Sequence, residues 1–142
     1  MTVYADSSFL VSSYVQDSHV TEFLRRISAH PSIWLTPFHK AELAHGIYLH
    51  VFYKKLTLDA ATRAWHEFQW DCAAGIWTPV SLPEGVWGTS VSLAQEHGPT
   101  LGVRTLDSLH VACALELKAQ QFWTFDDRQA RLAEAVGLDT SA

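Results

Sequence analysis

Apolar positions follow two different patterns along this chain. Short runs of β-favouring residues at 2–5, 32–36, 76–80 and 121–124 predict four strands. Between these runs, apolar residues recur every three or four positions, which predicts helices. Pro79 near the end of the third run indicates an edge strand or a strand end, because proline has no N–H to donate. The alternation of strand and helix predicts an α/β fold: a three-layer α/β/α sandwich with a mostly parallel central sheet.

Proline, glycine and hydroxyl residues indicate where several helices begin and end. Thr36 followed by Pro37 predicts a helix start, since a threonine side chain caps free N–H groups and proline suits the first helical position. A later helix is expected to open at Pro83 and to end at Gly98. Pro99 then begins a loop in this interpretation.

Composition limits the classes of protein to consider. A chain of 142 residues with 48% hydrophobic content predicts one domain, residues 1–142. No stretch approaches the ~20 apolar residues of a membrane span, so we expect a cytoplasmic protein without membrane attachment. Cys72 and Cys113 lack the spacing of a metal site and are interpreted as reduced core residues. The net charge of −5 argues against broad binding to phosphate backbones. It leaves a metal-assisted nuclease open, because a cation neutralises both acids and phosphate.

Four carboxylates occupy positions that can share one edge of the predicted sheet. Asp6 directly follows the first strand and Asp126 follows the last, while Glu42 and Asp107 lie in the first turns of helices. Helices that follow parallel strands begin at the carboxyl edge of the sheet, where ligands bind. Crowded carboxylates repel one another unless a cation is present, and their oxygens favour Mg²⁺ or Mn²⁺. The alternative role for Asp6 alone is that of a helix cap.

The segments around these acids resemble, in order, the acidic motifs of the PIN-domain family. The resemblance covers essentially the whole chain, and in size and motif wording it is greatest to the VapC-type toxins of bacterial toxin–antitoxin pairs, which are small ribonucleases. Each motif is short, but four in the right order are a specific signal. The matching segments are Val3-Tyr4-Ala5-Asp6-Ser7-Ser8, Ala41-Glu42-Leu43, Leu106-Asp107-Ser108-Leu109-His110-Val111-Ala112 and Thr124-Phe125-Asp126.

The resemblance implies a metal-dependent endoribonuclease that acts on RNA. Its implied catalytic acids are Asp6, Glu42, Asp107 and Asp126, of which Asp6, Asp107 and Asp126 would bind Mg²⁺ or Mn²⁺. Thr124 and Ser7 are implied to support the acids through their hydroxyls, and Arg104 is expected to contact substrate phosphate. Asp126 is preferred to Asp127 because it completes the Thr-x-Asp pattern, whereas Asp127 suits a helix N-terminus.

The resemblance also implies protein partners, namely a cognate antitoxin and a second copy of the chain in a homodimer. We expect the antitoxin to cover residues 37–53 and 58–72. The reason is an excess of aromatic residues, too many to face one small core. The alternative is that these aromatics are buried in the fold or in the homodimer. They are Tyr48, Phe52, Tyr53, Trp65, Phe68 and Trp70.

Three other interpretations compete with the nuclease. His45 follows Glu42 by three residues and His110 follows Asp107 by three, a spacing typical of di-iron helix bundles. The predicted strands disfavour such a bundle, so both histidines are interpreted as packing or hydrogen-bonded residues. A haloacid-dehalogenase-like phosphatase needs Asp-x-Asp, and Ser8 occupies that second place. A non-catalytic PIN-like binding module remains the main alternative, although four intact acids favour the enzyme because a repulsive cluster without metal is costly.

Overall fold

A four-stranded sheet forms the centre of the computed structural model, which describes residues 1–15 and 17–141. The strands lie in the order β3-β2-β1-β4, and all three neighbouring pairs are parallel. This arrangement confirms the predicted parallel sheet. The strands are β1 (Thr2–Ala5), β2 (Ser32–Leu35), β3 (Thr78–Pro79) and β4 (Gln121–Trp123).

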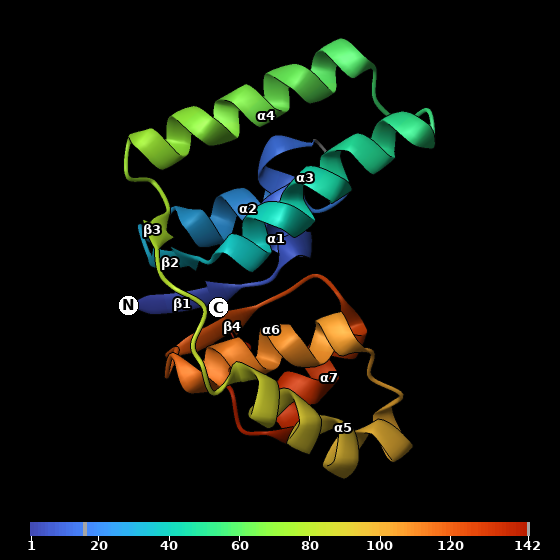
Figure 1. Cartoon of the computed structure of the whole chain (residues 1–142). Coiled ribbons are helices and arrows are strands. Elements are labelled where there is room, and N and C mark those ends of the chain that lie inside the picture. Colours follow the sequence, from blue (N-terminus) through green and yellow to red (C-terminus); the bar gives the residue numbers. More distant parts are fainter. Residues whose placement is uncertain (16, 142) are drawn as a thin grey trace.

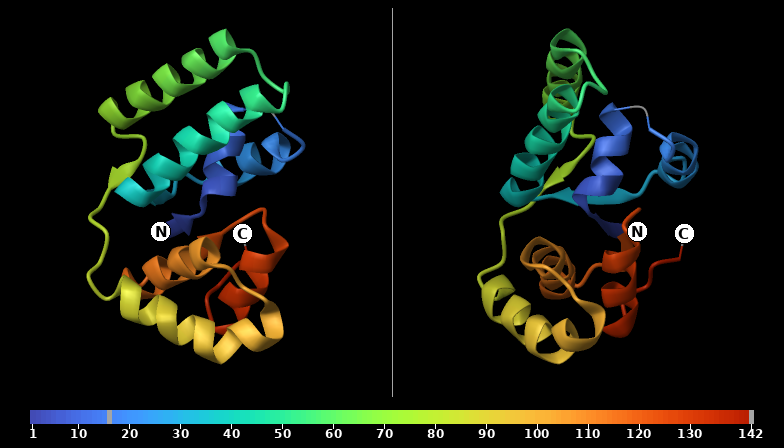
Figure 2. Two further views of the ribbon diagram at one scale, coloured as in Figure 1. Left: turned by 45° about the vertical axis from the view of Figure 1, so that its right-hand side comes forward. Right: turned by 90° about the vertical axis from the view of Figure 1, so that its right-hand side faces the viewer.

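Helices cover both faces of the sheet and complete the three predicted layers. In Figure 1, α1 to α4 lie above the strands and α5 to α7 lie below them, and the two turned views in Figure 2 show the same division. The helices are α1 (Ser7–Tyr14), α2 (Val20–Ile27), α3 (Pro37–Phe52), α4 (Leu58–Ala73), α5 (Val86–Leu101), α6 (Thr105–Glu116) and α7 (Asp127–Ala135). In the described part of the chain, no helix is long and apolar enough to cross a bilayer.

The central strand β1 divides the core into two apolar clusters. Val3 and Ala5 belong to the cluster between the sheet and α1 to α4, and Tyr4 belongs to the cluster between the sheet and α5 to α7. Successive side chains of a strand point to opposite faces, so β1 is covered on both sides. All three residues are fully buried, as expected for a central parallel strand.

Capping residues fix the two helix starts that matter most for the carboxyl edge of the sheet. Asp6 is the N-cap of α1, and its side chain accepts from the backbone N–H of Phe9. Thr36 caps α3 with Pro37 in the first turn, as its sequence predicts. Both helices therefore begin directly where β1 and β2 end.

The structure corrects three expected boundaries, of which the first is the start of α5, at Val86 rather than at Pro83. The third strand is only Thr78–Pro79 rather than 76–80. The Ile76 N–H bonds back to the Asp71 carbonyl of α4 at 3.0 Å, so residue 76 still belongs to the turn that follows that helix. Helix α5 does not end at Gly98 but continues to Leu101, which packs against the core. Its real end is Gly102, in the left-handed conformation at φ 63°, whose N–H bonds to the Gly98 carbonyl.

Candidate active site

A cleft of about 470 Å³ opens at the carboxyl edge of the sheet. Chain segments far apart in the sequence meet there, because the ends of β1 and β4 are neighbours and α3 and α6 begin at the same edge. Five of the seven predicted site residues line the cleft, whereas Asp6 and Thr124 do not. The lining residues are Ser7, Ser8, Glu42, Arg104, Thr105, Leu106, Asp107, His110, Asp126 and Gln129.

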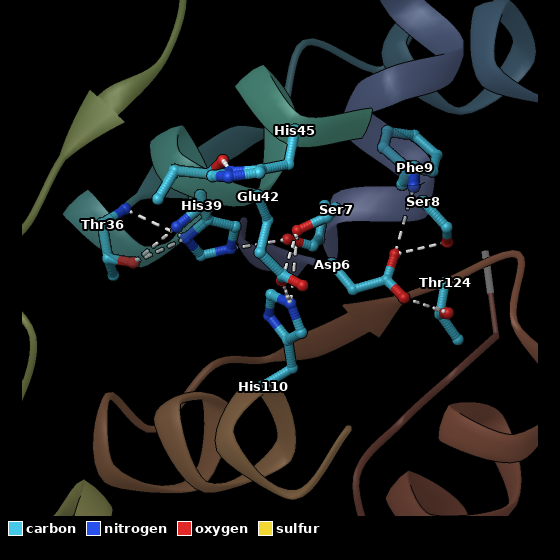
Figure 3. A network of polar contacts seen from close by, with 12 residues as sticks. Asp6, Ser7, Ser8, Phe9, Thr36, His39, Glu42, His45, His110 and Thr124 are labelled. Carbon is cyan, nitrogen blue, oxygen red and sulfur yellow. Dashed lines mark hydrogen bonds and ion pairs between the residues drawn. The ribbon is translucent and has the colours of Figure 1, made fainter. Parts of the chain in front are cut away.

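Asp6 is fully buried and held by three hydrogen bonds. Its Oδ1 accepts from the Ser8 hydroxyl at 2.6 Å and from the Phe9 backbone N–H at 3.1 Å, while its Oδ2 accepts from the Thr124 hydroxyl at 2.5 Å (Figure 3). Asp6 does cap α1, the alternative role considered from the sequence. The cap uses only one oxygen, so capping alone does not explain why a carboxylate is buried here.

Burial raises the pKa of the Asp6 carboxyl above its usual value. The interaction with His110 and the hydrogen bonds from Ser8, Thr124 and Phe9 oppose this effect without cancelling it. A carboxylate whose charged form is disfavoured by its surroundings gains from a nearby cation. The electrostatics of Asp6 are therefore those of a group that benefits from a bound metal ion.

Thr124 links the two acids that follow neighbouring strands. Its hydroxyl donates to Asp6 and accepts from the Asp126 backbone N–H at 2.9 Å. Asp126 in turn caps α7, accepting from two backbone N–H groups. Of the two adjacent acids, Asp126 lines the cleft, whereas Asp127 is the first residue of α7 and is exposed.

Glu42 reaches the cleft from the second turn of α3 rather than from the expected first turn, because the helix begins at Pro37. Two polar side chains hold it there. Its Oε1 accepts from the Ser7 hydroxyl at 2.7 Å and from His110 Nε2. Burial raises the pKa of the Glu42 carboxyl, but these contacts, mainly that with His110, outweigh burial and leave the pKa below its usual value. Glu42 is therefore a stably ionised acid at the cleft wall.

His110 is the residue whose importance the sequence did not reveal. The i, i+3 spacing paired it with Asp107 on its own helix, yet its ring contacts Glu42 on α3 and the Tyr4 hydroxyl on β1, the latter at 2.9 Å. His45, the other histidine considered, is exposed and bonds the Ala41 carbonyl of its own helix. Both are hydrogen-bonded residues, and only the contact between different elements gives His110 a place in the cleft.

Asp107 and Arg104 form the wall of the cleft at the start of α6. The Asp107 carboxylate accepts from the Arg104 backbone N–H at 3.3 Å, which satisfies one free N–H at the start of α6. The Arg104 guanidinium lies 3.8 Å from Asp107 Oδ2 and is 72% exposed. Asp107 itself is buried, but its contact with the exposed guanidinium is long, so the guanidinium can turn toward an incoming anion.

The donor chemistry of the cleft fits a hydrated divalent ion rather than a fully protein-bound one. Among the described residues, no three His, Cys, Asp or Glu side chains are grouped as a preformed metal cage. Mg²⁺ commonly keeps several waters and uses only one or two carboxylates. Gln129 supports this fit, because its Oε1 is buried in the cleft wall without a hydrogen-bond partner and can accept from metal-bound water.

Sequence and structure comparisons agree with this architecture. The PIN domain family matches residues 3–135, so the chain belongs to the PIN-domain family and the predicted resemblance is confirmed. The chain matches none of the curated proteins searched.

Three solved structures are similar to this chain over nearly their whole length. VapC20 of Mycobacterium tuberculosis, a sarcin–ricin loop cleaving toxin, has a TM-score of 0.67 and 14% identity, with 98% of each chain covered. FitAcB of Neisseria gonorrhoeae has a TM-score of 0.65 and 16% identity, with 93% of each chain covered. VapBC2 of Rickettsia felis, bound to promoter DNA, has a TM-score of 0.63 and 13% identity, with 92% of each chain covered. At these identities the likeness concerns the fold.

Proposed function

We propose that this chain is a metal-dependent endoribonuclease and the toxin of a toxin–antitoxin pair. The observation that carries the proposal is the arrangement of acids at one sheet edge. Glu42, Asp107 and Asp126 line a single cleft, and Asp6 lies buried beside it, hydrogen-bonded to the lining residue Ser8. Isolated buried carboxylates are costly, so their gathering favours a site that a cation completes.

Asp6, Asp107 and Asp126 are the residues that would hold Mg²⁺ or Mn²⁺. A bound ion of this kind lowers the pKa of its water and stabilises charge that develops on phosphate oxygens. The hydroxyl of Thr124 keeps the Asp6 carboxylate in one orientation, and the Gln129 carbonyl offers an acceptor to ordered water. Both contacts pre-organise the cleft before substrate arrives.

Two further residues act on the substrate side. Glu42 is ionised and anchored, which suits a group that orients an attacking water. Arg104 is exposed at the cleft wall, where a guanidinium can bind an RNA phosphate through two N–H groups. The net charge of −5 disfavours RNA binding elsewhere on the surface, so we expect RNA to bind only where it enters this cleft.

The direct test is cleavage of RNA by the purified chain with Mg²⁺, with Mn²⁺ and with EDTA. We expect cleavage only with a divalent ion, and loss of about a hundredfold or more in Asp6→Asn, because the variant keeps size but removes a ligand charge. Circular dichroism of Asp6→Asn checks that the fold survives. Undiminished metal-dependent cleavage by folded Asp6→Asn would rule the proposal out.

One observation keeps the non-catalytic binding module as a second candidate. The described residues form no preformed metal cage, and Glu42 already bonds His110 and Ser7. A binding module would bind RNA or protein equally well with EDTA, and Asp6→Asn would leave binding intact. Metal-dependent product formation excludes that candidate.

The antitoxin is proposed to bind over α3 and α4, where apolar side chains are exposed. Phe52 and Trp70 are 74% and 73% exposed, and Tyr48 and Tyr53 are also exposed. The structure corrects the other two members of the aromatic set. Phe68 is fully buried, and Trp65 is half-buried against the same cluster, because both lie on the core-facing stripe of α4.

Charge gives inhibition a physical route. A basic antitoxin side chain that reaches the acids of the cleft would pair with them and compete with the metal ion. The comparisons support such a partner, since VapBC2 and FitAcB are toxin–antitoxin structures with this fold. A second copy of the chain could cover the exposed aromatics instead, as a homodimer.

Co-expression with the neighbouring small open reading frame separates these possibilities. We expect a tag on one chain to recover both, and the antitoxin to relieve toxicity. Phe52→Ser with Trp70→Ser should weaken recovery if the antitoxin covers this surface, while light scattering of the free chain reports the homodimer. Recovery of this chain alone, with toxicity unrelieved, would remove the antitoxin proposal.

A further inference from the structure

We propose that Tyr4 and His110 are positioning residues that set which oxygen of Glu42 faces the reaction. The proposal deepens the nuclease proposal and concerns residues that bind neither metal nor substrate. The chain of contacts runs from the Tyr4 hydroxyl to His110 Nδ1 at 2.9 Å, and from His110 Nε2 to Glu42 Oε1. Figure 3 shows the His110 ring directed toward the Glu42 carboxylate.

The hydrogen-bond partners of the His110 ring determine its tautomer. The Tyr4 hydroxyl is fully buried and, like any tyrosine at neutral pH, carries its proton, so it needs an acceptor. The neighbouring Cys113 sulfur is a weak acceptor, whereas an unprotonated ring nitrogen is a strong one. Tyr4 therefore donates to Nδ1. The proton of the neutral ring then lies on Nε2, which donates to Glu42.

Packing fixes both rings in place. The Tyr4 ring stacks on Phe122 of β4 at 5.6 Å between centroids, with an interplanar angle of 5°. The His110 ring lies 4.5 Å from the Phe38 ring, and its side chain is 1% exposed. Neither ring can swing away without opening the core, so the donor reaches Glu42 from one fixed direction.

The anchoring is selective for one carboxylate oxygen. His110 and Ser7 both bond Oε1 of Glu42, which leaves Oε2 as the oxygen that can meet water or substrate in the cleft. A free glutamate side chain samples many rotamers, and holding it costs entropy during the reaction. Two anchors on one oxygen remove that cost in advance, which is how an acid is pre-organised for its task.

The tautomer is tested by ¹⁵N NMR of the metal-free chain labelled at histidine. We expect an Nε2–H ring for His110 in the wild type. Tyr4→Phe removes only the hydroxyl and keeps the ring stack, so it should lose this pure signature and show a mixture of ring states. A protonated Nδ1 in the wild type, or an unchanged spectrum in Tyr4→Phe, overturns the proposal. This measurement does not require cleavage, so it decides the proposal even if RNA is not the substrate.

Kinetics test the effect on Glu42. His110→Leu removes the donor and should lower kcat about tenfold or more with KM nearly unchanged, as loss of one hydrogen bond to a charged group implies. His110→Gln keeps an N–H donor and should recover a substantial part of that loss. His50→Gln is the matched control on α3, a histidine that bonds the Gly46 carbonyl of its own helix and does not bond Glu42, and should cleave as wild type.

Each kinetic outcome has a definite meaning. Wild-type kcat in folded His110→Leu overturns the positioning role, as does equal loss in the Leu and Gln variants. If His110→Leu does not fold, Tyr4→Phe carries the kinetic test, with a smaller decrease of roughly threefold expected. Absence of cleavage in the wild type counts against the nuclease proposal alone, since the NMR result stands apart from it.

Discussion

Replacing Thr124 by valine should destabilise the fold through the acidic site. Valine has nearly the shape of threonine but no hydroxyl, so the change removes two hydrogen bonds and little else. One is the 2.5 Å bond to Asp6 Oδ2, and the other is the 2.9 Å bond from the Asp126 backbone N–H. Both acids lose an anchor at the point where β1 and β4 end.

The two lost bonds set the magnitude. A hydrogen bond to a charged group contributes about 1.5–3 kcal/mol, and an amide left without its partner costs about 1 kcal/mol more. The added methyl group offsets part of this loss. We therefore expect Thr124→Val to lower the free energy of unfolding by about 3 kcal/mol, which for a chain of this length corresponds to a decrease in Tm of roughly 10 °C.

Urea unfolding at pH 7 provides the assay, with Thr124→Ser as the matched control because serine keeps the hydroxyl. Thr124→Ser should stay within about 1 kcal/mol of the wild type, as expected for loss of one methyl group. Equal stability of the valine and serine variants would refute the reasoning, since it would show that the hydroxyl does not hold Asp6.

Three further predictions concern stability. The pKa of Asp6 is raised in the folded state, so the contribution of its protonated form to stability is lost as pH rises through that pKa. In urea titrations, Asp6→Asn should therefore be at least as stable as the wild type at pH 7, and its advantage should shrink toward pH 4. Burial lowers the pKa of His39 to about 3, so the contribution of the neutral ring to folding stability is present above pH 6.5 and is lost as pH falls from 6.5 to 3. His39→Gln should remove this pH-dependent loss of up to about 5 kcal/mol, and an unchanged slope of stability against pH would contradict the prediction. Phe68→Ala should cost about 3–5 kcal/mol and Trp70→Ala less than about 1 kcal/mol, and similar losses in the two would contradict their burial.

Local signals made much of the fold predictable. Thr36 and Pro37 mark the start of α3, and the charged residue Asp6 marks the end of β1. Both boundaries were predictable because helix caps and isolated charges determine structure within a few residues of their own position. The end of α5 was not predictable in this way. Its position depends on Leu101 packing in the core, and packing between distant segments overrides the local signal of Pro99.

The site was predictable to the extent that single residues at strand and helix ends define it. The positions of Asp6 and Asp126 follow from the parallel sheet. The partner of His110 does not, since its contact with Glu42 joins two residues that lie 68 positions apart on different helices. Phe68 shows the opposite case: its place on the apolar stripe of α4 indicated burial, and counting it with the exposed aromatics was wrong.

The most direct test of the account compares two neighbouring acids that differ in place but not in chemistry. Asp126 lines the cleft and Asp127 faces solvent. Asparagine is a good N-cap, so Asp126→Asn should keep the start of α7 and remove only the charge. With Mg²⁺ or Mn²⁺ and a defined RNA, we predict that Asp127→Asn cleaves as wild type while Asp126→Asn loses about a hundredfold or more. Equal rates for the two variants would contradict the claim that the acids of this cleft cut RNA.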